Sequence, residues 1–269
     1  MTAKQSIAAF GASARQVFAF FFILGRKSAK ARVFALLGLV PVVLAVVVRI
    51  VMPGRSGDVM AVFTEILMVF FLQFYIVILS LFFGTSIVAE EIENRTLPYL
   101  ITRPLTKPGI IVGKFGAYAL LMALMVTVNL ALSYFIMNGY QLGEASLYLT
   151  FLRYAGVLGL GVLAYTAFFV FLGAVLKRAI LVGLVFGFGW ENVIQYFPGS
   201  TQKFSLAHYL KSLLPYRPAP GGKSTLSLLL FRLEPTTPAV SILTLAAVTA
   251  VLLALACWIF RTKEYLFEE

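Results

Sequence analysis

The chain has 269 residues, of which 61% are hydrophobic and only 12% are charged, against roughly 25% in an ordinary soluble domain. A mean hydropathy of +0.94 excludes a water-soluble fold, a disordered chain and a disulfide scaffold, and indicates an all-α membrane protein. The net charge of +11 comes from cations between apolar runs, which favours anionic lipid over nucleic acid as the partner.

The N-terminal segment 1–32 predicts an interfacial helix followed by a basic linker. Arg15 and Gln16 interrupt its apolar residues, and the uninterrupted run 17–24 is too short to cross a bilayer. The cluster Arg26, Lys27, Lys30 and Arg32 follows. An amphipathic helix in the membrane interface fits this pattern. A signal peptide fits less well, because no small-residue cleavage site follows the apolar run.

Six runs are each close to the 20 or so apolar residues that a membrane helix needs. Four carry no charge, whereas the first contains Arg49 near its end. We expect Arg49 to reach the outer interface, although a pair with Glu65 is an alternative. The runs are 33–52, 66–89, 115–137, 154–176, 179–197 and 238–260.

The short loops set the orientation. The turn 138–146 has no cation, whereas Lys177 and Arg178 form a tight cationic turn. Since cytoplasmic loops are enriched in Lys and Arg, we expect a multi-pass protein of the cytoplasmic (inner) membrane with both termini in the cytoplasm.

The cytoplasmic segment 90–109 between the second and third spans is too polar to enter the bilayer. Acidic residues come first and basic residues later, and three prolines limit any helix to short pieces. Such a compact charged loop can dock a soluble partner. A solvated connection between two spans is the alternative, and the residues alone leave both open.

The motif EEIENRTL at 90–97, with LITRPL at 100–105 and Gly113-Lys114, resembles the corresponding loop of ABC-2 type transporter permeases. The six spans, the interfacial helix and the cytoplasmic termini match this family too. The resemblance implies one permease domain over 1–269 and a coupling helix that docks on an ATPase. Its start would be Glu90, Glu91, Glu93, Arg95 and Thr96, its exit Arg103 and Lys107, and Lys114 would lie at the cytoplasmic end of the third span.

This resemblance implies a transport subunit, an exporter in most such systems, that is not itself an enzyme. ATP and Mg would bind to the partner ATPase, with no cofactor or catalytic site in this chain. A second permease chain, identical or homologous, and membrane lipids would complete the assembly. A membrane anchor or mechanotransmission subunit that holds an ATPase without moving substrate is the alternative. The single Cys257 and single His208 cannot form a metal site of their own.

The outer segment 198–237 is long for a loop. Residues 205–214 predict an amphipathic helix, with Leu206 and Leu210 on one face and His208 and Lys211 on the other. The helix would lie on the outer leaflet, and the apolar piece 226–231 could be re-entrant or lie on the surface.

Polar groups within the spans have two readings each. Glu191, Asn192 and Gln195 could line the exit of a pathway, or mark where the fifth span ends. Asn129, like the other mid-span polar residues, is expected to hydrogen-bond between helices, or could face the pathway. The GxxxG pairs Gly109/Gly113 and Gly183/Gly187 favour packing within the chain over a dimer seam.

Overall fold

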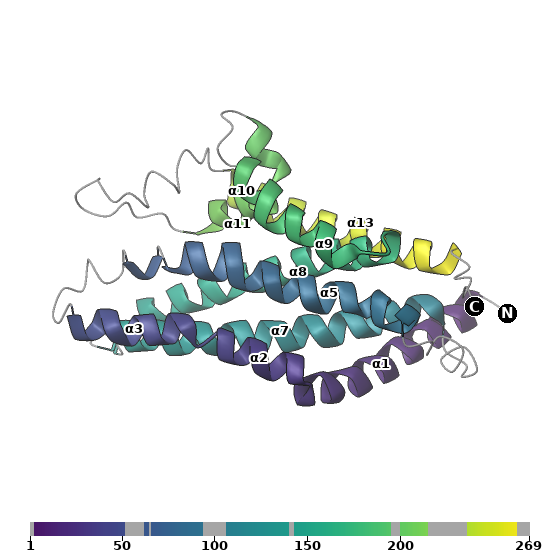
Figure 1. Ribbon diagram of the computed structural model, residues 1–269, viewed down its shortest axis with the longest axis horizontal. Coiled ribbons are helices and arrows are strands. Elements are labelled where there is room, and N and C mark those ends of the chain that lie inside the picture. Colours follow the sequence, from purple (N-terminus) through teal and green to yellow (C-terminus); the bar gives the residue numbers. More distant parts are fainter. Residues whose placement is uncertain are drawn as a thin grey trace.

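The computed structural model describes residues 3–51, 62–64, 66–93, 106–139, 143–194, 200–214 and 236–262. Regular structure in these ranges is entirely helical, and most helices run along the long axis of the molecule (Figure 1). The helices are α1 (Ala3–Lys27), α2 (Ala29–Leu37), α3 (Val40–Val51), η1 (Leu67–Tyr75), α5 (Ile76–Glu93), α7 (Lys107–Met137), α8 (Ala145–Val175), α9 (Ala179–Leu184), η2 (Val185–Trp190), α10 (Glu191–Val193), η4 (Ser200–Phe204), α11 (Leu206–Leu213) and α13 (Pro238–Thr262).

Within these ranges, five helices are long and apolar enough to cross a membrane. They are Ala29–Val51, Val62–Val88, Lys107–Met137, Ala145–Val175 and Pro238–Thr262, and they correspond to five of the six predicted spans. The predicted fifth span is present as a shorter apolar helix, Ala179–Val193. At about 1.5 Å per residue it is roughly 22 Å long, less than the hydrocarbon core of a typical bilayer. Large apolar side chains are exposed along α3, α8 and α13, as on a lipid-facing surface.

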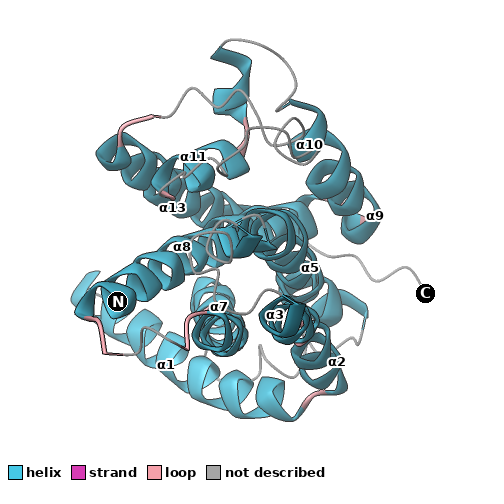
Figure 2. Ribbon diagram, turned by 90° about the vertical axis from the view of Figure 1, so that its left-hand side faces the viewer, coloured by secondary structure: helices cyan, strands magenta, loops and turns pink. Residues whose placement is uncertain are grey.

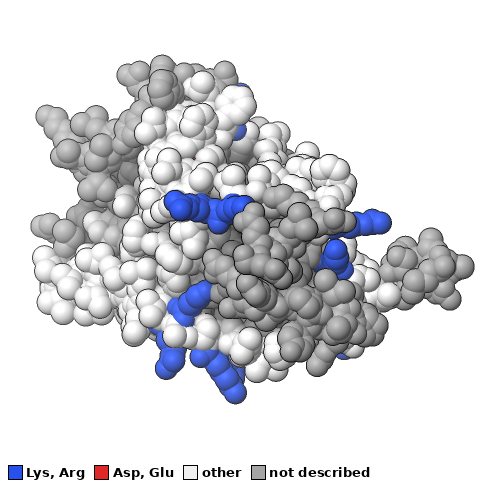
Figure 3. Space-filling view, turned by 45° about the vertical axis from the view of Figure 1, so that its right-hand side comes forward, with Lys and Arg blue, Asp and Glu red and all other residues white. Residues whose placement is uncertain are grey.

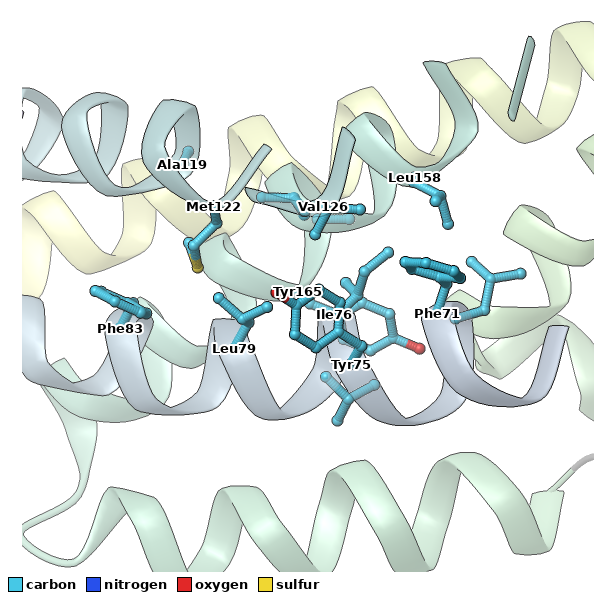
Figure 4. Packing of buried hydrophobic residues seen from close by; sticks show 14 of the residues in the cluster. Phe71, Tyr75, Ile76, Leu79, Phe83, Ala119, Met122, Val126, Leu158 and Tyr165 are labelled. Atoms are coloured by element: carbon cyan, nitrogen blue, oxygen red, sulfur yellow. The ribbon is translucent and has the colours of Figure 1, made fainter. Parts of the chain in front are cut away.

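The core lies where α5, α7 and α8 meet (Figures 2 and 4). A Cβ atom on Gly84 would lie 3.1 Å from the carbonyl oxygen of Thr166, and one on Gly173 would lie 3.0 Å from that of Thr85. These glycines therefore let the backbones of α5 and α8 approach closely, which helix packing in lipid requires. The hydroxyl of Thr166 donates to Ser80 across the same contact, as expected for a mid-span polar residue.

The predicted N-terminal helix is present as α1, and it packs along the first half of α7. A Cβ on Gly109 would lie 2.9 Å from Cβ of Ser13, and a Cβ on Gly113 would lie 2.6 Å from the carbonyl oxygen of Ala14. The second GxxxG pair, Gly183 and Gly187, faces Leu81 and Val77 of α5. Both pairs thus make contacts within the chain, and the prediction of intramolecular packing is confirmed. The place of α1 at the membrane interface stays a prediction.

Arg49 in the last turn of α3 donates to the carbonyl oxygen of Met137, with an N–O distance of 3.0 Å. This carbonyl belongs to the last turn of α7, so no backbone N–H further along the helix can donate to it. Snorkelling alone is therefore an incomplete explanation, because Arg49 also joins the first span to the end of the third. Glu65, the alternative partner, lies outside the described residues.

The α1–α7 contact predicts the effect of a single methyl group. Gly113→Ala places a Cβ against the Ala14 carbonyl and 2.8 Å from Cβ of Val17, neither of which can rotate away. We expect unfolding in detergent micelles to be destabilised by about 1–3 kcal/mol. Gly156→Ala on α8 is the matched control, since nothing lies within 4 Å of its Cβ position, and it should be neutral or slightly stabilising. Equal stability of the two variants would contradict the close approach.

Candidate functional site

The two flanks of the predicted coupling loop emerge at the same end of the bundle as both termini (Figure 1). The backbone of Glu90, Glu91 and Glu93 continues α5 to its last residue, so these residues close the second span helix without a break. Lys107 is exposed and begins α7. Arg95, Thr96 and Arg103 lie outside the described residues, so the coupling helix itself stays a prediction.

The exit of this loop is held by α1. The backbone N–H of Thr106, the N-cap residue of α7, donates to Oγ of Ser13 over 3.2 Å. Lys114 lies two turns inside α7 and not at its end, with 1% of its surface exposed. Its ammonium is 4.3 Å from the centroid of the Phe21 ring on α1, a cation–π geometry. The helix continues N-terminal to Lys114 because α1 covers that part of α7.

The end of the bundle that carries the flanks of the predicted coupling loop is basic among the residues whose side chains are described. Lys107, Lys177, Arg178 and Arg261 are exposed there. Figure 3 turns this end toward the viewer and shows lysine and arginine side chains around it, with no described acidic side chain on that face. This distribution agrees with the cation asymmetry expected for a cytoplasmic face.

A second polar cluster is built around Glu191 on α10, which is only 3% exposed. Its carboxylate accepts hydrogen bonds from the hydroxyl of Ser205, from the N–H of Leu206 at 3.0 Å and from the N–H of Ala207 at 3.3 Å. Leu206 and Ala207 are the first residues of α11, whose N–H groups have no partner within the helix. Glu191 therefore caps α11 with a negative charge at the positive end of the helix dipole.

The polar face of α11 points into this cluster and away from water. Lys211 is 4% exposed and His208 is 1% exposed. Burial lowers the pKa of Lys211 to about 8, although the nearby negative charge of Glu191 opposes the shift. The predicted amphipathic helix exists, but both of its faces are buried, because its polar face has a carboxylate to pack against.

The other predicted pathway residues are not gathered at one site. The amide of Asn192 donates to the carbonyl of Phe188 in its own helix at 2.9 Å, and Gln195 lies outside the described residues. Asn129 on α7 donates to the hydroxyl of Tyr75 at 3.2 Å and to the carbonyl of Met125. The expectation that Asn129 hydrogen-bonds between helices is confirmed. The roles of these residues in a pathway stay predictions.

Sequence reasoning missed three residues that the structure brings to these clusters. Tyr165 on α8 hydrogen-bonds to Glu191, Ser205 is the N-cap of α11, and Ser13 holds the coupling-loop exit. A serine directly before a predicted helix is a recognisable N-cap signal, so Ser205 could have been found from the sequence. Tyr165 and Ser13 carry no such local signal.

Comparison with known families decides the classification. The family described as "ABC-2 family transporter protein" matches residues 3–265, nearly the whole chain. The chain belongs to the ABC-2 transporter family. It is a multi-pass membrane component of an ABC transporter, a class that generally lacks its own nucleotide site and works with an ATPase subunit. A search of curated proteins finds no match to this ABC-2 protein.

The Glu191 cluster of this ABC-2 protein predicts an asymmetric pair of mutants. Glu191→Gln removes the charge that caps α11 and leaves Lys211 buried without it, so we expect a loss of about 3 kcal/mol in unfolding free energy. Lys211→Met removes a buried cation whose cost is mainly desolvation, and it should be tolerated within about 1 kcal/mol.

A double-mutant cycle in detergent micelles measures this coupling. The double variant Glu191→Gln/Lys211→Met should be more stable than Glu191→Gln alone. Glu144→Gln, an exposed acidic residue at the start of α8, is the control and should change nothing measurable. Strict additivity of the two substitutions would contradict an energetic link between Glu191 and Lys211.

Proposed function

We propose that this chain is a permease subunit that couples ATP hydrolysis by a separate ATPase to the export of a substrate across or out of the cytoplasmic membrane. The family match over residues 3–265 carries the proposal. Two permease chains, identical or homologous, would enclose the pathway, and each would receive one ATPase on its inner face.

The proposed topology has six membrane-crossing segments, with Ala179–Val193 and the cluster that caps it completing the fifth. The two tryptophans support this placement. Trp258 lies on α13 about 20 residues from Pro238, a rise of roughly 30 Å that matches the hydrocarbon thickness. Trp258 and Trp190 are both exposed, as expected for residues at the two membrane interfaces.

The proposed coupling runs through the two helices that flank the loop 94–105. α5 is continuous from Ile76 to Glu93, α7 begins at Lys107, and both pack on α8. A push on the loop would therefore reach the core along two helices and not through a flexible linker. The contact between Ser13 and Thr106 would keep the exit of the loop in register with α1.

At the outer end, Glu191 would hold α11 over α8 and α13, against which α11 packs. In the proposed function α11, which is part of the segment 198–237, lies beside the exit, and Asn192 and Gln195 contribute to that exit. The alternative, an anchor or mechanotransmission subunit without transport, predicts the same contact with the ATPase. Transport driven by ATP in reconstituted vesicles separates the two functions.

Charge reversal tests the coupling assignment. Glu91→Lys together with Glu93→Lys should release the co-purifying ATPase or reduce its permease-stimulated ATP hydrolysis roughly tenfold or more, because like charges across a docking surface cost several kcal/mol. Affinity pull-down of the tagged permease and phosphate release measure the two effects. Glu144→Lys, which lies at the opposite end of the bundle, is the control. Retention of both the ATPase and its stimulation in the double variant would contradict the assignment.

Cysteine labelling tests the topology. In a Cys257→Ser background, Ser146→Cys and Lys203→Cys should react with a membrane-impermeant maleimide in intact spheroplasts. Lys107→Cys and Lys177→Cys should react only after lysis, because we place them in the cytoplasm. All four parent residues are exposed, so burial does not explain a failure to react. Labelling of both groups from the same side would contradict six crossings.

A further inference from the structure

The first span is interrupted near its middle. α2 ends at Leu37, α3 begins at Val40, and Gly38 and Leu39 form a turn between them. Pro41 accounts for the break, because it lacks the N–H that would bond to the carbonyl of Leu37 and its ring crowds that position. The span is therefore two helical rods joined at a two-residue turn.

The second span is irregular as well. η1 is a π-helix over nine residues, and the chain returns to the α-helical pattern at Ile76. π-helical turns are rare, and they occur frequently at functional positions.

Both irregularities meet at Tyr75, the last residue of η1. Its side chain is 0% exposed. Its hydroxyl donates to the carbonyl oxygen of Phe34 in α2 over 3.0 Å and accepts from the amide of Asn129 in α7. One tyrosine thus joins the break in the first span to the second and third spans. Within a bilayer this bond has no water to replace it.

The contact leaves no spare room at Gly38. A Cβ atom there would lie 2.5 Å from the Tyr75 hydroxyl and closer still to Nδ2 of Asn129. Gly38 has an ordinary right-handed backbone conformation, so the glycine is needed for this close approach and not for its φ angle. Any larger residue would push the turn away from the tyrosine.

The two sides of the break differ in what holds them. α3 packs mainly on α7, and Val43, Val47 and Ile50 on its other face are exposed. α5, α7 and α8 instead form the buried core. A swing of α3 would release its contact with α7 and the bond from Arg49 to Met137, but it would leave the packed side chains between the core helices in place.

We propose that Tyr75 and Asn129 are positioning residues for a hinge at Gly38–Leu39, about which α3 swings relative to α2 during the transport cycle. This proposal rests on the proposed function, in which an ATPase drives the cycle. The bonded arrangement described above is one end of the swing. In the other, α3 and the Gly38 turn move away from Tyr75, and the π-helix takes up the change.

Double electron–electron resonance distances test the hinge in the permease–ATPase complex, reconstituted in nanodiscs in a Cys257→Ser background. The outer label pair is Ile50→Cys with Leu152→Cys, and the inner pair is Val33→Cys with Val175→Cys. All four positions are exposed. A non-hydrolysable ATP analogue should shift the outer distance and leave the inner distance unchanged.

Two substitutions test the positioning role. Tyr75→Phe removes both hydrogen bonds of the hydroxyl, to Phe34 in α2 and from Asn129 in α7, and so releases the α2 side of the hinge beside Gly38. The outer pair without nucleotide should then shift toward the displaced distance by roughly three- to tenfold in population ratio. Gly38→Ala should shift it in the same direction by steric exclusion. Tyr134→Phe is the matched control. Its buried hydroxyl donates to the carbonyl of Leu147 over 3.1 Å, which joins α7 to α8 and not to the hinge.

A purely structural role for Tyr75 would lower the unfolding temperature of Tyr75→Phe and Tyr134→Phe alike without changing the distances, and would overturn the hinge. Equal nucleotide-driven shifts of the inner and outer pairs would also overturn it, because the first span would then move as one piece, and the proposed function would stand. A third label pair, Lys107→Cys with Val175→Cys, reports on the region beside the coupling loop. If none of the three pairs responds to nucleotide, both the ATPase coupling and the hinge are wrong.

Discussion

A chain inside a bilayer has to satisfy its own backbone polar groups, and the contacts that join the elements of this protein follow from that constraint. An unbroken helix satisfies them automatically. At two helix ends, a side chain from another element bonds to a terminal backbone group: Arg49 to the carbonyl of Met137 in α7, and Glu191 to the first N–H groups of α11. Near the break in the first span, Tyr75 adds a second hydrogen bond to the carbonyl of Phe34, which also accepts from the N–H of Gly38. Each of these bonds also fixes the position of one element against another.

The remaining cohesion comes from close packing, since lipid gives no hydrophobic drive for helices to associate. Glycines are placed where backbones have to touch: Gly84 and Gly173 between α5 and α8, and Gly109 and Gly113 between α7 and α1. The result is a tight centre of α5, α7 and α8, on which α3, α9 and α13 pack. In the proposed coupling, a force applied at the loop between α5 and α7 would act on this centre directly.

Hydropathy predicted where the chain crosses the membrane better than where its helices end. α7 begins at Lys107 and α8 at Ala145, several residues before the apolar runs that start at 115 and 154. Lys114 and Arg153 come directly before those runs, because a charge ends an apolar stretch without ending a helix. α1 covers Lys114, and Arg153 is exposed about two turns into α8. The predicted fifth span is described as the shorter helix Ala179–Val193, and residues 195–197 of that run lie outside the described residues.

In each polar cluster, the sequence pointed to the one residue that is unfavourable in an apolar span, Glu191 or Asn129, and not to the residues that bond to it. A carboxylate in an apolar run marks Glu191 from the sequence, but Ser205 and Lys211 stand in a segment expected to lie on the leaflet. Only the tertiary fold brings the polar face of α11 onto Glu191. Asn129 shows the same limit from the other side. A lone amide in mid-span could serve a pathway or another helix, and Pro41 and Gly38 mark a backbone defect far away in the sequence. Which of these the amide serves depends on helix register across the bundle, a property that no single helix encodes.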